Sequence, residues 1–145
     1  MSLPDFSNYQ RESVISMASA QSTVLVIDDN EDIRNLVSLV LEKEGYRVLI
    51  GIDGSDGLEK LGLNKVDLVF LDVMMPGISG LELLKKIRAN KSKEINSVPI
   101  CMITAKSSVE DIDAALELGA TSYIVKPFRP TALTDKANSL LVAAV

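Results

Sequence analysis

The chain contains no histidine among its 145 residues, and this absence excludes several kinds of site at once. Without an imidazole there is no histidine general base, no histidine metal ligand and no phosphohistidine made on the chain itself. Cys101 is the only cysteine, so no internal disulfide can form, and its apolar neighbours in the sequence favour a buried, inert thiol. A metal site in this chain would therefore use oxygen ligands.

Long apolar runs and dense basic segments are also missing. No stretch reaches the roughly 18 consecutive apolar residues of a membrane helix, and the N-terminus lacks the basic and apolar regions of a signal peptide. The densest basic segment, residues 85–93, is interrupted by apolar and polar residues, and the net charge is −5. We therefore expect a cytoplasmic protein that binds neither membrane nor, through this domain alone, nucleic acid.

The length suits one domain with a sizeable core. Residues 1–22 are rich in Ser, Asn and Gln, and their apolar residues fit no regular period. We interpret them as a flexible leader or linker, separate from a domain over residues 23–145. The chain suits either a stand-alone domain or a piece of a longer regulator or hybrid kinase.

From Thr23 onward, apolar runs alternate with amphipathic segments, which predicts five strand–helix pairs. Strands are expected at 24–27, 46–50, 68–71, 98–103 and 122–125. Helices are expected at 30–44, 53–63, 80–89, 108–118 and from residue 130 onward. This (βα)₅ order predicts an α/β fold, a doubly wound parallel sheet with helices on both faces.

Candidate caps mark the helix ends. Asn30 is expected to cap the first helix, and two pairs, Ser79 with Glu82 and Ser107 with Glu110, have the spacing of capping boxes. Gly45 and Gly119 are expected just after the first and fourth helices. The apolar faces of these two helices are expected to include Leu36 and Leu116.

Four of the five predicted strands deliver polar groups to one edge of the sheet. The first strand is followed by Asp28 and Asp29, the third by Asp72, the fourth by Thr104 and the fifth by Lys126. Each residue alone has an ordinary explanation as a turn, cap or surface residue. Those explanations do not account for the convergence of all these residues at the carboxyl ends of parallel strands, where α/β sheets bind ligands.

Three crowded carboxylates repel one another unless a cation lies among them. With oxygen ligands only, Mg²⁺ is the first expectation, ahead of Mn²⁺ or Ca²⁺. Lys126 would add a second positive charge and Thr104 a hydrogen-bond donor. Such an arrangement suits phosphoryl transfer with Asp72 as the nucleophile.

Four segments carry a resemblance to a known family: VLVIDDNEDIR, DLVFLDVMMPGISGLELL, VPICMITA and GATSYIVKPF. In these segments and in their order, the chain from about Thr23 resembles the receiver domain of two-component response regulators, which are CheY-like. The resemblance implies a flavodoxin-like sheet of order 2-1-3-4-5. It also implies that Asp72 accepts a phosphoryl group from a sensor histidine kinase or a histidine phosphotransfer protein.

The resemblance assigns roles to the residues at the sheet edge. Asp29, Asp72 and the backbone carbonyl of Met74 would ligate Mg²⁺ directly, and Asp28 would act through metal-bound water. Lys126 would contact the phosphoryl group, and Thr104 would bond a phosphoryl oxygen after transfer.

Further residues follow from the same resemblance. Tyr123 falls at the aromatic switch position that moves together with Thr104, and Pro127 is expected to follow a cis peptide bond. Met75 is expected to pack in the turn after Asp72, while Met74 and Lys106 occupy the variable positions that tune phosphoryl lifetime. One departure from the family is the segment DGSDGLEKLG, where an Ala-rich helix is usual.

The resemblance also implies partners. The phosphohistidine donor would dock near the first helix, and a homodimer could form through the fourth helix, fifth strand and fifth helix. The domain would catalyse only its own phosphorylation and dephosphorylation, and would not be an enzyme acting on other substrates.

Three rival classes are weaker. A related aspartyl-phosphate hydrolase usually has a second Asp where this chain has Met74, and a Rossmann or P-loop domain needs a Gly-rich turn after its first strand. A receiver-like scaffold that works without phosphorylation would be marked by a missing Asp or Lys, and none is missing here.

Overall fold

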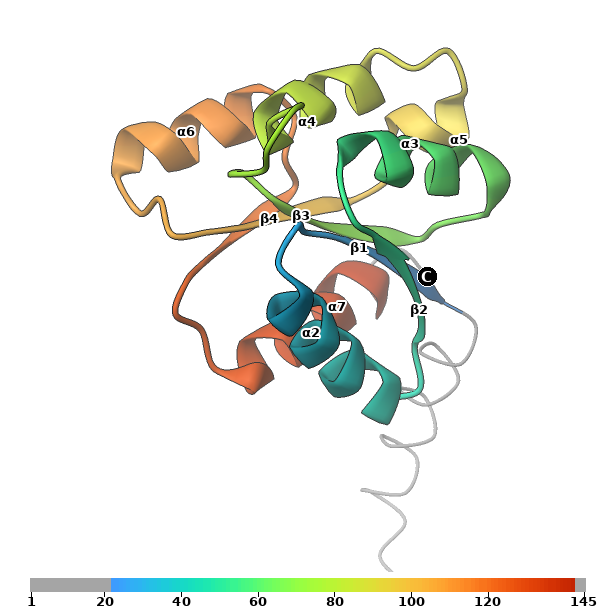
Figure 1. The fold of residues 1–145 in the computed structure, drawn as a ribbon, viewed down its shortest axis with the longest axis vertical. Coiled ribbons are helices and arrows are strands. Elements are labelled where there is room, and N and C mark those ends of the chain that lie inside the picture. The colour runs from blue at the N-terminus through green and yellow to red at the C-terminus, as the bar shows by residue number, and fades with distance from the viewer. Residues whose placement is uncertain (1–21, 143–145) are drawn as a thin grey trace, which may run out of the picture.

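The computed structural model describes residues 22–142, which form a five-stranded parallel sheet covered by helices on both faces (Figure 1). The strands are β1 (Thr23–Ile27), β2 (Arg47–Gly51), β3 (Leu68–Asp72), β4 (Ile100–Thr104) and β5 (Ser122–Val125). Their order is β2-β1-β3-β4-β5, which confirms the predicted fold. The interpreted leader, apart from Ser22, lies outside the described residues.

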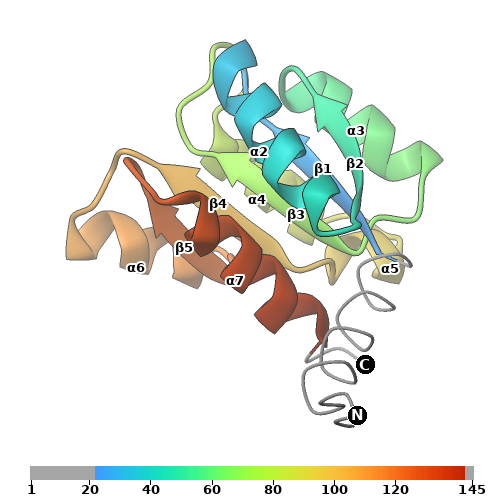
Figure 2. The same ribbon diagram turned by 90° about the horizontal axis from the view of Figure 1, so that it is seen from below.

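The helices divide between the two faces of the sheet (Figures 1 and 2). They are α2 (Glu31–Lys43), α3 (Gly54–Leu63), α4 (Gly80–Arg88), α5 (Lys93–Asn96), α6 (Val109–Glu117) and α7 (Pro130–Val142). One face carries α2 and α7, and the other carries α3 to α6. Two apolar cores follow from this division, one on each side of the sheet.

The central strands are buried on both faces. Every residue of β1, β3 and β4 is buried, which explains why these segments are continuous apolar runs in the sequence. Alternate side chains point to opposite faces, so Leu25 and Ile27 join one core while Val24 and Val26 join the other. Polar residues that serve a site can therefore be placed only at the ends of these strands.

Most of the predicted helix ends are confirmed. Asn30 caps α2 by accepting a hydrogen bond from the Ile33 amide, and Ser79 caps α4 by accepting one from the Glu82 amide. The cap of α6 is one residue later than predicted, because Ser108, and not Ser107, accepts the bond from the Asp111 amide. The carboxylate of Asp111 also accepts a bond from the Ser108 hydroxyl at 2.8 Å, a second contact that fixes this register.

Other boundaries differ from expectation for local reasons. Helix α5 was not predicted, because four residues are too short to show a helical period. Strand β4 begins at Ile100 and not at residue 98, since Pro99 has no amide hydrogen to donate to the ladder.

Two leucines predicted on inner helix faces are exposed instead. The exposed fraction is 38% for Leu36 and 44% for Leu116. Helix α6 lies toward the β5 edge of the sheet, where less apolar surface is available to cover it (Figure 1). Each helix face was therefore predicted too wide by one position.

Helix α3 forms over ten residues despite its glycines. Gly57 packs against the sheet so closely that an added Cβ would lie 2.5 Å from Cδ1 of Ile27. Gly62 is exposed, and an added Cβ there would meet nothing within 4 Å. Packing against Ile27 thus explains the glycine at position 57. No packing contact explains the glycine at position 62.

We expect these two glycines to respond differently to alanine. Gly62→Ala should raise the free energy of unfolding by about 0.5–1 kcal/mol, because it only removes backbone freedom from the unfolded chain. Gly57→Ala should gain less or lose stability, since the Ile27 side chain must move. Urea unfolding followed by circular dichroism measures both, and an equal gain at the two sites would contradict this account.

Candidate functional site

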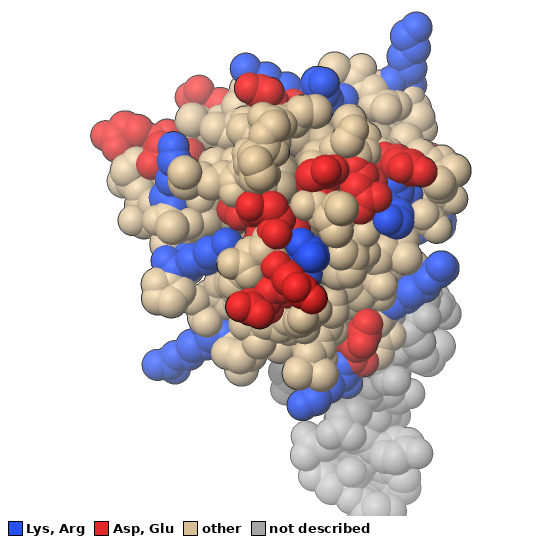
Figure 3. All heavy atoms as spheres, viewed as in Figure 1, with Lys and Arg blue, Asp and Glu red and all other residues tan. Residues whose placement is uncertain are grey.

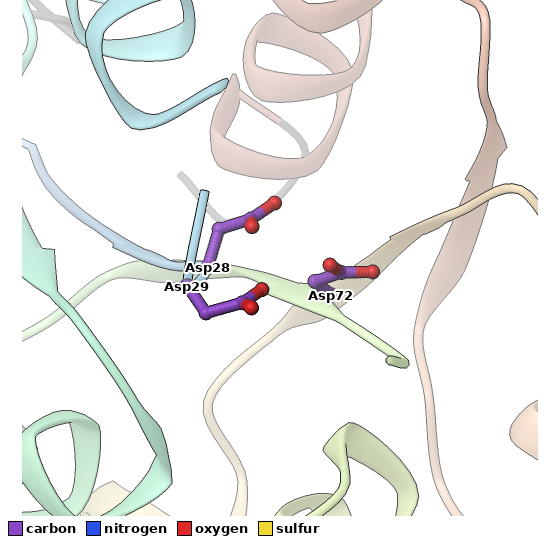
Figure 4. Close-up of side chains that lie close together, drawn as sticks. All are labelled: Asp28, Asp29 and Asp72. Carbon is purple, nitrogen blue, oxygen red and sulfur yellow. The ribbon is translucent and has the colours of Figure 1, made fainter. Parts of the chain in front are cut away.

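Three carboxylates meet at the carboxyl ends of β1 and β3 (Figure 4). Strand β1 pairs with β3 so that Ile27 lies opposite Leu71, which places Asp28 beside Asp72. One oxygen from each of Asp28, Asp29 and Asp72 lies within 4.8 Å of the others. The convergence predicted from the sequence is present in the structure.

The backbone of Asp28 is held from several directions. This residue is 2% exposed, and its amide donates to the carbonyl of Gly51 at 3.2 Å. Its Oδ1 accepts a bond from the Asn30 amide at 2.9 Å, and its carbonyl accepts one from Nη1 of Arg34, also at 2.9 Å. Asp29 is exposed, at the open side of the cluster.

Asp72 is the last residue of β3 and is 7% exposed. Burial raises the pKa of its carboxyl group, and the neighbouring Asp28 carboxylate raises it further. Lys126 and the amide of Met74, which donates to Asp72 Oδ1 at 3.3 Å, act in the opposite direction. A negative charge at Asp72 is therefore unfavourable in this protein unless a cation offsets it.

Lys126 lies between the two buried acids. Its Nζ is 3.4 Å from Asp28 Oδ2 and 3.5 Å from Asp72 Oδ2. Its amide donates to the Thr104 carbonyl at 2.8 Å, which fixes the end of β5 beside β4. The peptide bond between Lys126 and Pro127 is cis.

Thr104 and Tyr123 both form hydrogen bonds with the backbone of Lys106, in the loop after β4. Thr104 is fully buried, and its hydroxyl accepts a bond from the Lys106 amide at 3.2 Å. The Tyr123 hydroxyl donates to the Lys106 carbonyl at 2.7 Å. Burial and then the Asp111 carboxylate raise the pKa of Tyr123, against an opposing contact with the Thr104 hydroxyl.

The loop after Asp72 is shaped by its packing and by one close approach. Met75 is 8% exposed and packs in the core, whereas Met74 is 60% exposed. The two methionines help to line an open groove of about 480 Å³, which Lys106 borders. At the start of α4, an added Cβ on Gly80 would lie 2.0 Å from the Asp72 carbonyl oxygen, so only glycine fits there.

Acidic side chains also surround the cluster. Acidic side chains gather near the centre of the face shown in Figure 3. The first turns of α2 and α3 carry Glu31, Asp32 and Asp56. The pKa of Asp56 is lowered, mainly by the bond from the Ile52 amide. Carboxylates close to the site favour the binding of a cation there.

The donor set fits a hard divalent cation. The described residues offer carboxylate oxygens at this edge and no imidazole or thiolate. The chain has no histidine, and Cys101 is buried in the core under α2 and α7. Oxygen-only sets of this kind are those that Mg²⁺ prefers. The acidic triad is thus consistent with a divalent metal site.

Residues 24–138 match the family described as Response regulator receiver domain. The chain belongs to this family. It is 42% identical over 118 residues to the response regulator ArlR of Staphylococcus saprophyticus, covering 81% of this chain and 51% of that protein. It is 40% identical over 118 residues to the alkaline phosphatase synthesis transcriptional regulatory protein PhoP of Bacillus subtilis, covering 81% of this chain and 48% of that protein.

A solved structure of the chemotaxis response regulator CheY4 of Vibrio cholerae has a TM-score of 0.77 with this receiver domain. The identity is 34%, and the match covers 83% of this chain and 98% of that one. The chain spans about half the length of the curated relatives it matches. Within residues 22–142, no helix is both long and apolar enough to cross a membrane.

Two residues at this edge were not singled out from the sequence. Gly80 is needed because α4 approaches the Asp72 carbonyl, a contact that no local pattern reveals. Arg34 reaches back one helical turn from α2 to the Asp28 carbonyl. Its spacing of six residues from Asp28 fits no local hydrogen-bonding pattern, so the sequence offers no signal for this contact.

The raised pKa of Asp72 predicts a pH-dependent cost in stability. In metal-free protein, the folded state binds a proton at Asp72 more readily than the unfolded state, so its contribution to stability falls as pH rises through the ordinary carboxyl range and beyond. Asp72→Asn should therefore be more stable than the parent at pH 7 in chelator, and this advantage should shrink toward pH 4. Urea unfolding at the two pH values measures it.

Asp135→Asn is the matched control, because it removes the same charge from an exposed position on α7. An equal gain in both variants would mean that net charge, and not the crowding at Asp72, causes the effect.

Proposed function

We propose that this receiver domain takes a phosphoryl group from a phosphohistidine onto Asp72 and changes conformation in response. The observation that carries the proposal is the position of Lys126 between Asp28 and Asp72, with Thr104 on the neighbouring strand. Membership of the family implies a histidine kinase partner in a two-component system. The donor would be that kinase or a histidine phosphotransfer protein.

The chain's own residues supply most of the chemistry. An Asp72 carboxylate oxygen attacks the phosphorus in line as the bond from phosphorus to the donor imidazole breaks. Lys126 exchanges its pairing with Asp72 for a contact to a phosphoryl oxygen, and the Thr104 hydroxyl donates a hydrogen bond to another. Asp28 stays anchored and keeps its own contact with Lys126.

Asp29, Asp72 and the Met74 carbonyl would hold Mg²⁺ directly, and Asp28 would hold it through water. When bound, the ion would neutralise the carboxylates and the negative charge of the transferring group. Phosphorylation and self-dephosphorylation at Asp72 would be the only reactions, so the domain would not be an enzyme acting on other substrates.

The donor would dock beside α2, where an open apolar groove of about 420 Å³ adjoins the site. Ile33, Leu36, Pro127 and Phe128 line it together with Lys126 and Ala105. The exposure of Leu36, which contradicted its predicted place in the core, has a use in this position. A cytoplasmic location is part of the proposal, since the family's kinase partners act there.

The structural change would run through Tyr123 and Thr104 to the face made by α6, β5 and α7. Val109 and Leu116 are exposed on α6, at 69% and 44%. Self-association through this face, expected from the family resemblance, would use these two side chains.

Incubation with acetyl phosphate should add one phosphoryl group to the protein when Mg²⁺ is present and none in chelator. Asp72→Asn should take none, because it lacks the attacking oxygen. Lys126→Met should be phosphorylated at least tenfold more slowly, since no ammonium group then stabilises the negative charge of the transferring phosphoryl group. Intact-mass spectrometry measures all three.

Asp135→Asn serves as the control and should be phosphorylated like the parent protein. Phosphorylation of Asp72→Asn at the parent rate would overturn the assignment of the acceptor. No gain in a folded parent that binds Mg²⁺ would favour a scaffold or a strict requirement for the cognate kinase.

Tyr123→Phe tests the switch separately from the chemistry. It removes the bond from the hydroxyl to the Lys106 carbonyl, so phosphorylation should continue while its effect on α6 weakens. Hydrogen exchange of the α6 amides, with and without acetyl phosphate, measures this effect. An unchanged response in the variant would show that the hydroxyl plays no part in transmission.

A further inference from the structure

The bond from Arg34 to the Asp28 carbonyl lies where the sheet's own pairing stops. The β1–β3 ladder runs from Val24 opposite Leu68 to Ile27 opposite Leu71. The Asp28 amide still pairs with the Gly51 carbonyl of β2, but the Asp28 carbonyl is held by the Arg34 guanidinium at 2.9 Å. A charged side chain thus takes the place of a ladder donor at the first acidic residue.

We propose that Arg34 is a positioning residue that fixes the peptide between Asp28 and Asp29 and thereby aims both carboxylates at the cation site. The proposal rests on the proposed Mg²⁺ binding. It assigns to Arg34 no contact with the ion or the phosphoryl group. Its action runs through the backbone of the two acids.

Asp29 needs this support more than its neighbours do. Asp28 Oδ1 is bonded to the Asn30 amide, and Asp72 Oδ1 to the Met74 amide. Within the described part of the chain, no hydrogen bond or ion pair holds the carboxylate of Asp29, which is exposed. The orientation of the Asp29 carboxylate therefore depends on the conformation of its own backbone.

The bond from Arg34 adds to the cost of rotating this peptide, because it holds the carbonyl directly. The guanidinium comes from the first turns of α2, whose own start is fixed by the Asn30 cap. Arg34 is half-buried, and its bond is charge-assisted, which makes it stronger than a neutral one. Helix α2 and strand β1 are thus joined at the acid pair by one side chain.

Simple electrostatics predicts the opposite effect for the loss of Arg34. A positive charge near a cation site repels the cation, so its removal alone should strengthen Mg²⁺ binding. Positioning predicts that the same removal weakens Mg²⁺ binding. The sign of the change therefore separates the two roles.

The test measures the Mg²⁺ dissociation constant by isothermal titration calorimetry on the full chain. Arg34→Met should weaken binding by about tenfold, the usual cost of losing a group that orients metal ligands. Arg34→Lys, which retains a donor and the charge, should recover part of the loss. Arg47→Met, which loses the same charge at the far end of β2, should bind like the parent.

Tighter or unchanged Mg²⁺ binding in Arg34→Met would overturn the proposal. A second measurement needs no metal: hydrogen exchange at the amides of Asp28 and Asn30 in chelator. Both should exchange faster in Arg34→Met than in the parent, while the Val26 amide, inside β1, should not. Unchanged exchange at both amides would equally overturn the positioning role.

The two arms also separate this inference from the function on which it rests. A parent protein that binds no Mg²⁺ would remove the proposed metal site. Faster exchange in Arg34→Met would then still show that Arg34 positions the acidic pair. Circular dichroism of each variant establishes that a change reflects the site and not loss of the fold.

Discussion

Electrostatic repulsion between buried carboxylates is the constraint on which the rest of this structure depends. Asp28 and Asp72 have oxygens within 4.8 Å of each other, and at an effective dielectric constant of 20 two such charges repel by about 3.5 kcal/mol. That is a large share of the about 5–15 kcal/mol that stabilises a typical domain. A fold selected only for stability would place one of these acids elsewhere. Their retention at the end of a buried sheet is understandable if a cation and a phosphoryl group are what the edge holds.

Several features of the fold serve to keep the acids together against this repulsion. The parallel pairing of β1 and β3 sets their spacing, and the absence of a side chain at Gly80 lets α4 begin directly beneath Asp72. The backbone of Lys126 is bonded to the Thr104 carbonyl of β4, which places its ammonium group within reach of both acids. These constraints come from separate parts of the chain, and no single segment could form the site alone.

The sequence predicted what depends on local pattern. Buried strands and amphipathic helices show their periods directly, and the polar residues that follow the strands can be placed at one edge once the sheet is known to be parallel. The features that it missed depend on how segments far apart in the sequence pack against one another. Leu116 belongs to the apolar period of its helix, yet the edge of the sheet leaves it uncovered. Arg88 donates from α4 to the Gly119 carbonyl, and Arg34 to the Asp28 carbonyl, but neither contact has a spacing that marks it in advance.

The position of Lys126 would connect the electrostatics of the site to the proposed change of conformation. In the state described here its ammonium group partly offsets the charge of Asp28 and Asp72. A phosphoryl group on Asp72 would move the negative charge outward, and Lys126 would have to follow it or lose its stronger partner. Because the backbones of Lys126 and Thr104 are joined by a hydrogen bond, a shift at one would be transmitted to the other. The Thr104 hydroxyl and the Tyr123 hydroxyl both bond the backbone of Lys106, so the same loop would receive that shift. The repulsion that makes the site costly would therefore also contribute to a response to phosphorylation.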